Sequence, residues 1–241
     1  MLILFDSSNG ALQAIIEAFA LGQLRTGGIS GVATRWLAAA DAAELAVIGT
    51  GKQMLAQVAA VAAVRPLRRV RVFSPNPKHR AQAVQRLQAA MRCAVVETKS
   101  VDACVDGASI ITLVTRATQP FLTAAMVAAG AHVNAVGAIT PERAEFAAGL
   151  FSRCGRIVVD SVPAVRKLSR EFIDHFGDSE ARWQTVTPLC TVAEHIVTRR
   201  VPARSVCAKP PIPPGLAVAG QGPAPGAGLW RVRKWPHDQP G

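Results

Sequence analysis

The chain has 241 residues, half of them apolar, with 5% aromatic residues and no tyrosine. This length can bury a sizeable core and corresponds to one large or two modest domains. The formal net charge is +11. Residues 199–241 contain seven Lys/Arg and one Asp, so more than half of the excess positive charge lies in this terminal segment. A basic segment of this kind disfavours a specific nucleic-acid surface.

The first predicted element is a helix over residues 13–40. The glycine cluster TGGISG at 26–31 weakens a free helix. These glycines allow close approach of the backbone either to a ligand or to a second helix.

Short runs rich in Val and Ile then alternate with longer Ala/Gln/Arg segments of helical spacing. Strands are predicted over residues 44–49, 69–74, 93–98, 109–114, 131–137 and 156–161, and helices over 52–63, 78–90, 101–107 and 123–130. Such alternation predicts an α/β fold with a doubly wound parallel sheet covered on both faces. The strand spacing fits one domain spanning residues 41–162.

The end of the chain has a different composition. Residues 163–200 are predicted to be a helical return segment. Residues 201–241 contain most of the prolines and are rich in glycine and basic residues. Such a segment buries too little apolar surface to offset the entropy of ordering, so a disordered tail is predicted.

The five cysteines, at positions 93, 104, 154, 190 and 207, form no C-x-x-C pair and no metal-ligand spacing with the five histidines. Scattered thiols are typical of a reducing compartment. The start, MLILFDSSNG, lacks a basic region, and no run reaches the roughly 18 apolar residues of a membrane span. We therefore expect a cytoplasmic protein without a metal, a membrane partner or a nucleic-acid partner.

The stretch VIGTGKQM, at residues 47–54, resembles two phosphate-binding turns. A triphosphatase loop needs a glycine five residues before Gly51 and a hydroxyl after Lys52, but the chain has Ala46 and Gln53 there. A dinucleotide turn needs glycines between a strand and a helix, and Gly49 and Gly51 meet that requirement. We predict that Gly49, Thr50, Gly51, Lys52 and Gln53 contact a dinucleotide.

The end of the second predicted strand bears on the choice of cofactor. An acid there would bind the ribose 2′-hydroxyl of NAD, but the chain has SPNPKHR, with no carboxylate. Small polar and basic side chains, Ser74, Asn76 and Arg80 among them, suit a 2′-phosphate. The sequence therefore favours NADPH, with NADH possible.

Longer motifs resemble the ornithine cyclodeaminase/mu-crystallin family. They are LRTGGISGVATRWLA (24–38), VIGTGKQ (47–53), TRATQPFL (115–122), GAHVNAVGAITPERAEF (130–146) and VVDSVPAVRKLSREF (158–172). The resemblance covers residues 2–200 and implies a Rossmann domain for NAD(P)H, here residues 41–162, beside a substrate and dimerisation domain. Residues 1–40 would be part of that second domain.

The resemblance also implies roles for single residues. Arg25 matches the arginine that holds the substrate carboxylate, and Thr26 lies next to the cofactor phosphates. Val136 and Gly137 would lie beside the nicotinamide, and Thr115 would line the cofactor cleft. No catalytic residue is assigned.

The loop after Gly137 distinguishes branches of the family. Cyclodeaminases carry an aspartate there for acid/base work, but this chain has Ile139, which cannot exchange protons. The wording GAITPERAEF instead resembles ketimine reductases, which reduce Δ1-pyrroline-2-carboxylate or Δ1-piperideine-2-carboxylate to L-proline or L-pipecolate. A cyclodeaminase-type lyase and a non-catalytic cofactor-binding remnant stay open as alternatives.

Other residues receive structural interpretations. His132 is predicted to be a structural histidine, and Asp160 and Ser161 either shape the cleft or cap a helix. Glu142 and Glu145 are predicted to be solvated acids at a helix start.

Compared with the family, we expect a missing N-terminal segment that includes the strands used for homodimers, and a divergent end after residue 200 that a shifted reading frame would explain.

Overall fold

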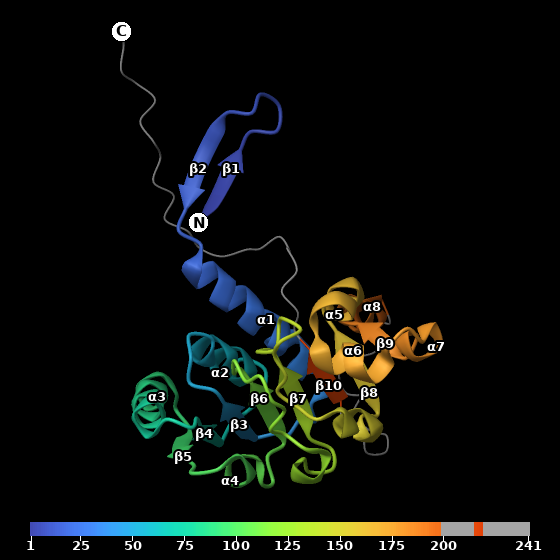
Figure 1. The fold of residues 1–241 in the computed structure, drawn as a ribbon. Helices are drawn as coiled ribbons and strands as arrows, with labels where there is room; N and C mark the ends of the chain where they lie inside the picture. Colours follow the sequence, from blue (N-terminus) through green and yellow to red (C-terminus); the bar gives the residue numbers. More distant parts are fainter. Residues whose placement is uncertain (199–214, 219–241) are drawn as a thin grey trace.

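The computed structural model describes residues 1–198 and 215–218 (Figure 1). Its centre is a sheet with the strand order β5-β4-β3-β6-β7-β10-β8-β9, in which every neighbouring pair is parallel. The strands are β3 (Glu44–Ile48), β4 (Arg69–Phe73), β5 (Ala94–Glu97), β6 (Ile110–Leu113), β7 (His132–Ala135), β8 (Arg156–Val159), β9 (Val186–Pro188) and β10 (Gly215–Val218). The predicted α/β class is confirmed, and the predicted strands are found within one or two residues of their expected ends.

Helices cover both faces of this sheet. They are α1 (Phe19–Leu37), α2 (Met54–Ala62), α3 (Pro77–Ala90), α4 (Val101–Val105), α5 (Val162–Leu168), α6 (Arg170–Phe176), α7 (Glu180–Trp183) and α8 (Leu189–Thr198). The helix predicted over 123–130 is only a short 3₁₀ turn, η1 (Ala124–Met126), because so short a connection does not supply the packing that stabilises an α-helix.

The two faces of the sheet have separate apolar clusters. Leu45 and Val47 of β3 pack with α2 and α3, whereas Ala46 and Ile48 pack with α4, α5 and α6. Successive residues of a strand point to opposite faces, so an uninterrupted apolar run is required when both faces are covered. Residues 45–48 of β3 follow this rule, whereas β4, with the sequence RVRVF, alternates arginine with buried valine.

Helix α1 packs closely on α2. A Cβ at Gly27 would lie 2.7 Å from the Ala56 carbonyl oxygen, and one at Gly31 would lie 3.1 Å from that of Ala60. Glycines four residues apart lie on the same helix face and let the two backbones approach. Of the two explanations for the glycine cluster, contact with a second helix accounts for these positions.

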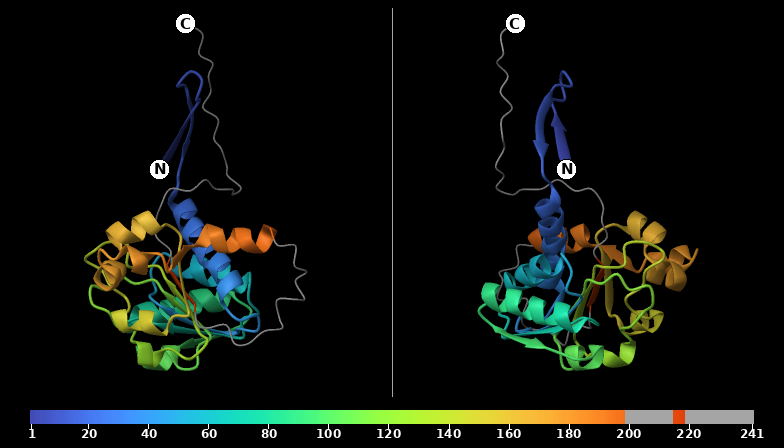
Figure 2. Two further views of the ribbon diagram at one scale, coloured as in Figure 1. Left: turned by 90° about the vertical axis from the view of Figure 1, so that its right-hand side faces the viewer. Right: turned by 60° about the vertical axis from the view of Figure 1, so that its left-hand side comes forward.

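An antiparallel hairpin precedes α1 and stands away from the rest of the molecule (Figures 1 and 2). It consists of β1 (Leu2–Phe5) and β2 (Leu12–Ile16). The predicted helix over 13–40 is therefore wrong at its start, since the helix begins at Phe19. Pairing with β1 is a contact between separate segments, which helical spacing does not reveal. Both faces of the hairpin are accessible, because successive residues of β1 point to opposite faces and Leu4 is 50% and Phe5 59% exposed.

The segment after β8 contains the helices α5 to α8, but also the strand β9, which the prediction of a helical segment missed. Aromatic side chains anchor its first part. Phe151 lies 5.0 Å from Phe172 and 5.3 Å from Phe176 between ring centroids, and Trp183 lies 4.9 Å from Phe176. Edge-to-face and tilted rings at these distances stabilise a core beyond their buried area. This cluster fixes α6 against the sheet.

The predicted tail is described only at β10. Residues 215–218 form a strand between β7 and β8, so disorder is the wrong prediction for these four residues. The rest of the predicted tail, residues 201–214 and 219–241, lies outside the described residues.

Candidate cofactor site

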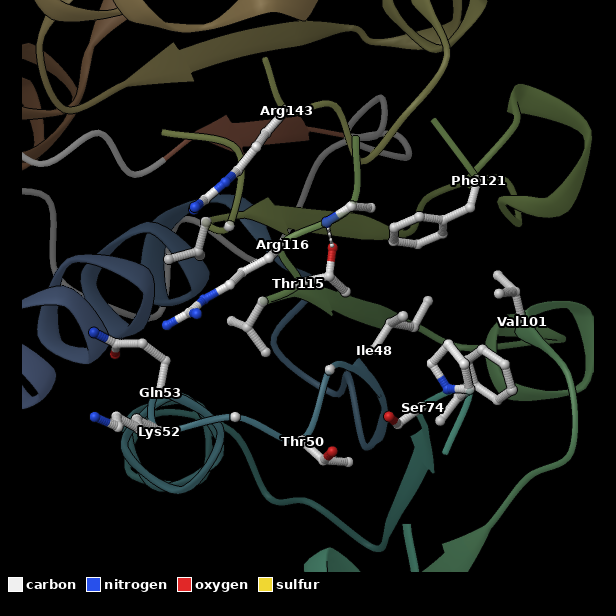
Figure 3. Close-up of a pocket in the computed structure, with 18 of the residues that line it drawn as sticks. Ile48, Thr50, Lys52, Gln53, Ser74, Val101, Thr115, Arg116, Phe121 and Arg143 are labelled. Carbon is white, nitrogen blue, oxygen red and sulfur yellow. Dashed lines mark hydrogen bonds between the residues drawn. The ribbon is translucent and has the colours of Figure 1, made fainter. Parts of the chain in front are cut away.

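A cavity of about 630 Å³ opens at the carboxyl ends of β3, β6 and β7 (Figure 3). Strand β3 has β4 on one side and β6 on the other, so the chain reverses its direction of winding between β3 and β6. In doubly wound folds, ligands bind in the crevice at such a switch point. The order of the strands by itself therefore indicates where a ligand would bind.

The turn from β3 into α2 forms one wall of the cavity. Gly49 has a φ of +109°, and a Cβ there would lie 2.6 Å from the Val114 carbonyl oxygen. Only glycine adopts this backbone without strain. At Gly51 a Cβ would meet nothing within 4 Å, so this position borders open space in the cavity.

These features fit the phosphates of a dinucleotide. Helix α2 has no side chain capping its N-terminus, and although the Met54 N–H donates to the Gly51 carbonyl at 3.2 Å, the positive end of the helix still favours an anion. Gln53 also lines the cavity, and its buried Oε1, which has no hydrogen-bond partner among the described residues, is an acceptor that suits a ligand hydroxyl and not a phosphate oxygen. The absence of a Cβ at Gly51 leaves room for a ligand to approach the backbone.

The end of β4 differs from the expectation for a 2′-phosphate site. Ser74 lines the cavity, but Asn76 and Arg80 do not. Asn76 caps α3, because its Oδ1 accepts from the N–H groups of Lys78 and His79 at 2.9 and 3.2 Å. Arg80 is 9% exposed and donates to the Ser74 carbonyl at 2.7 Å and to Glu97 at 2.8 Å. The structure thus corrects the predicted roles of Asn76 and Arg80: both brace the turn between β4 and α3.

The ends of β6 and β7 are joined by Glu145. Its Oε1 accepts from the N–H of Thr115 at 2.6 Å and from the Thr115 hydroxyl at 2.7 Å, and its Oε2 accepts from the N–H of Gly137 at 2.7 Å. Glu145 is fully buried and lies outside any helix. The prediction of a solvated acid at a helix start is therefore wrong, because three donors from distant segments hold this carboxylate inside the protein.

Burial raises the pKa of Glu145 to about 7, although the hydrogen bonds from Thr115 and Gly137 act in the opposite direction. A second buried carboxylate, that of Glu171 on α6, accepts from the Glu145 N–H at 2.8 Å and from the Ser169 hydroxyl at 3.0 Å. Burial also raises the pKa of Glu171. A chain of buried polar groups thus connects α6 with the cavity.

Basic side chains gather on one side of the cavity. Figure 3 shows Arg116 and Arg143 extending toward the side where Lys52 and Gln53 lie, with Phe121 on the opposite side. No ion pair between Arg116 or Arg143 and another described residue is found. Sequence reasoning assigned these two arginines no role. The available signal was that Arg116 follows the end of β6 closely, in TRATQP, and that Arg143 lies in the loop after β7, in TPERAEF.

The predicted site residues divide into two groups. Those in the cavity lining are Gly49, Thr50, Gly51, Lys52, Gln53, Ser74, Thr115, Val136 and Gly137. The others lie outside it: besides Asn76 and Arg80, Arg25 is half-buried on α1, and the Thr26 hydroxyl donates to the Gly22 carbonyl at 2.9 Å. The structure brings together the predicted cofactor residues of four strand ends, those of β3, β4, β6 and β7, but not the predicted substrate arginine.

His132 is structural, as predicted. It is fully buried, and its Nε2 lies 3.1 Å from Asn134 Oδ1, while Asn134 Nδ2 donates to the Thr34 hydroxyl at 3.0 Å. These contacts attach α1 to β7. Ser161 caps α5, since its hydroxyl oxygen accepts from the Ala164 N–H at 3.3 Å, which favours the capping interpretation for this residue.

Within the described residues, no helix is long and apolar enough to span a membrane, and no cluster of three His, Cys, Asp or Glu is suited to a metal ion.

Comparison with protein families shows where the chain belongs. The ornithine cyclodeaminase/mu-crystallin family matches residues 1–171, which include the whole dinucleotide turn and the Glu145 loop. The chain is a member of this family.

Curated relatives within the ornithine cyclodeaminase/mu-crystallin family carry different activities. An ornithine cyclodeaminase of Brucella suis is 35% identical over 166 residues, 68% of this chain and 46% of that protein. A Δ1-pyrroline-2-carboxylate reductase of Bacillus cereus is 32% identical over 178 residues, 74% of this chain and 52% of that protein. A ketimine reductase mu-crystallin of Macropus fuliginosus is 31% identical, covering 71% of this chain and 53% of that protein. The chain spans about half the length of these relatives.

Solved structures share the fold. The Thermococcus litoralis Δ1-pyrroline-2-carboxylate reductase in complex with NADH and L-proline matches with a TM-score of 0.80 at 23% identity, over 91% of this chain and 65% of that one. The iminosuccinate reductase of Paracoccus denitrificans in complex with NAD⁺ matches with a TM-score of 0.73 at 24% identity, over 91% and 64%. Likeness at this identity establishes the Rossmann-type architecture.

Proposed function

We propose that the cavity binds a reduced nicotinamide dinucleotide and that the protein uses it to reduce a cyclic ketimine. The substrate would be Δ1-pyrroline-2-carboxylate or Δ1-piperideine-2-carboxylate, and the product L-proline or L-pipecolate. Support comes from the family, from the relatives named as reductases, and from the glycine turn at the switch point of the sheet.

One observation carries the choice of a reductase. Among the described residues that line the cavity, none is acidic, and Ile139 lies there where the resemblance gives cyclodeaminases an aspartate. A deamination requires a side chain that exchanges protons with the substrate, and isoleucine cannot do so. A reduction needs less from the protein, because a protonated imine already accepts hydride.

The bound dinucleotide would supply a hydride to the C=N carbon, with the nitrogen keeping the electron pair of the double bond as an amine. The residues of this chain would bind and orient. The Gly49–Gly51 turn and the N-terminus of α2 suit the diphosphate. Arg116 and Arg143 suit anionic groups, with the guanidinium of Arg143 proposed for the substrate carboxylate. Phe121 and Ile139 provide apolar walls that exclude water.

Arg25 keeps its proposed role as a carboxylate ligand only through the family resemblance. The proposed preference for NADPH now rests on Ser74 and on Lys78 and His79, which are exposed at the start of α3, because Arg80 is engaged by Glu97. Titrating the protein with NADPH and NADH while following reduced-nicotinamide fluorescence tests this preference. Equal affinity for the two dinucleotides would refute it.

The reductase proposal is tested by mixing the purified chain with NADPH and Δ1-piperideine-2-carboxylate and following the absorbance of the reduced nicotinamide. We expect oxidation that depends on the imine and is lost in Arg143→Met but not in Arg92→Met, an exposed arginine outside the cavity lining. Dinucleotide binding without oxidation would leave only a cofactor-binding protein.

A cyclodeaminase is the second candidate, and the Brucella suis relative named ornithine cyclodeaminase is what favours it. In that case ornithine alone, with catalytic NAD⁺ and no imine, would release ammonia and form proline. The reductase proposal expects no ammonia above the blank.

We also propose that a second copy of this chain covers the apolar hairpin and that the protein is cytoplasmic. The exposure of Phe5 and Ile15 supports the first proposal, and the scattered free cysteines support the second. Light scattering tests the association: Phe5→Glu should lower the measured mass, whereas Ser7→Glu, at an exposed position in the hairpin turn, should not. A monomer in the unaltered protein would refute it.

A further inference from the structure

Glu145 adds a side-chain link between two loops whose backbones are also joined by the Ala144 N–H, which donates to the Ala117 carbonyl at 3.0 Å. Thr115 follows β6 and Gly137 follows β7, and both are in the cavity lining. Glu145 lies in the same loop as Gly137, 8 residues after it, and 30 residues after Thr115 along the chain. Its own main chain is also fixed, because its carbonyl oxygen accepts from the N–H groups of Phe121 and Leu122 at 3.1 Å.

The donor pattern requires a carboxylate. Each carboxylate oxygen faces a backbone N–H, Oε1 that of Thr115 and Oε2 that of Gly137. A carboxylate accepts at both oxygens, whereas an amide carries an NH₂ group that would confront one of the two N–H donors. The packing is also tight, since a Cβ at Gly137 would lie 2.6 Å from Glu145 Oε1. No solvent is available to take the place of a lost contact, because Glu145 is fully buried.

We propose that Glu145 is a positioning residue of the dinucleotide site: it fixes Thr115 and Gly137 relative to each other and so sets the width of the cavity floor on which the cofactor lies. This inference rests on the dinucleotide part of the proposed function. It assigns Glu145 no contact with substrate or cofactor, because the carboxylate is behind the lining residues.

The groups around Glu145 make its positioning role sensitive to pH. From α6 it is faced by the carboxylate of Glu171, which itself accepts from the Glu145 N–H. The strand ends contribute the uncharged Thr115 and Gly137, and the cations on the same loops are Arg116 and Arg143. Since the pKa of Glu145 is raised to about 7, a proton enters this carboxyl group near neutral pH and removes an acceptor from one of the two N–H donors.

The test compares Glu145→Gln with Glu142→Gln, the same substitution at an exposed glutamate of the same loop. Binding of NADH and of NADPH is measured by fluorescence from about pH 6 to about pH 8.5. We expect Glu145→Gln to weaken both dinucleotides about tenfold, the loss typical of one charge-assisted hydrogen bond, and Glu142→Gln to bind as the unaltered protein does. Affinity of the unaltered protein should fall as the pH decreases through about 7, and that of Glu145→Gln should not.

Unchanged affinity in Glu145→Gln, with an unchanged pH profile, would overturn the proposal. If this variant does not fold, the pH series of the unaltered protein decides, and an affinity that is constant for both dinucleotides across that range refutes the role. NADH is needed beside NADPH because it has no 2′-phosphate that titrates in the same range.

Amide hydrogen exchange without any ligand provides a separate measurement. The Thr115 and Gly137 amides should exchange faster in Glu145→Gln, while amides in β3 keep their protection. Equal exchange in both proteins would remove the basis of the inference. If the unaltered protein binds neither dinucleotide, the proposed function fails, and the exchange data still show whether Glu145 fixes the two loops.

Discussion

The raised pKa of Glu145 predicts a specific dependence of protein stability on pH. In the folded protein this carboxyl group holds its proton up to about pH 7, whereas in the unfolded chain it releases the proton near its ordinary value of 4.5. Between these values the folded state binds more protons than the unfolded state, so the free energy of unfolding falls as the pH rises. Below about pH 4.5 and above about pH 7 the contribution of Glu145 to the slope disappears.

The magnitude follows from the two pKa values. A difference of about 2.5 pH units corresponds to roughly 3 kcal/mol, at about 1.4 kcal/mol per unit. Glu145→Gln removes the titrating group and should remove this part of the slope. Glu171 stays in both proteins and contributes equally to each, so the difference between the two stability curves isolates Glu145.

Urea unfolding at a series of pH values from about 4.5 to about 8, followed by circular dichroism, measures both curves. We expect the stability of the unaltered protein to decrease relative to that of the variant by roughly 3 kcal/mol across this range. Parallel curves would show that the carboxyl group ionises normally in the folded protein and would refute the reasoning from burial.

Three further substitutions test other parts of the structure. Gly51→Ala places a methyl group in open space of the cavity, so the variant should fold normally but bind the dinucleotide about tenfold or more weakly in a fluorescence titration. The control Gly149→Ala, at an exposed glycine outside the cavity lining, should bind as the unaltered protein does. Equal affinities of the two variants would exclude close approach of a ligand to Gly51. Gly27→Ala should lower the melting temperature, because its Cβ would lie 2.7 Å from a carbonyl oxygen of α2. Gly28→Ala, at the neighbouring glycine whose added Cβ would meet nothing within 4 Å, should stabilise α1 by up to about 1 kcal/mol. A change of the melting temperature in the same direction for both variants would contradict the close packing of α1 on α2. Arg80→Met should destabilise the fold and change NADH and NADPH affinity equally, since the guanidinium is bound by Glu97 and the Ser74 carbonyl; a loss confined to NADPH would restore its predicted contact with the 2′-phosphate.

Several features followed directly from local sequence patterns. The strands β3 to β8 were predictable because each is a short run that contains Val, Ile or Ala and lies between helical or turn segments, as in a parallel sheet covered on both faces. The tight turn between β3 and α2 was predictable because a glycine pair between a strand and a helix is itself a local pattern, and Gly49 adopts the positive φ that this turn requires. Its contact with a dinucleotide stays a prediction.

The sequence misled where a residue's partner lies in another segment. Arg80 looked like a free cation for a phosphate, but Glu97, 17 residues later, binds it. Residues 13–16 looked helical, but they belong to β2, which pairs with β1. Arg116 and Arg143 were not assigned any role, because only the arrangement of their loops brings them to one side of the cavity.

By itself, the sequence determined the fold class, the family and the position of the cofactor turn, since all three are written in runs of neighbouring residues. Tertiary structure decided the state of Glu145. A glutamate in TPERAEF has the composition of a solvated loop, and nothing next to it shows that Thr115 and Gly137 will supply three donors to its carboxylate. Burial and hydrogen bonding depend on which segments contact one another in the folded protein, and the periodicity of residues along the chain does not reveal those contacts.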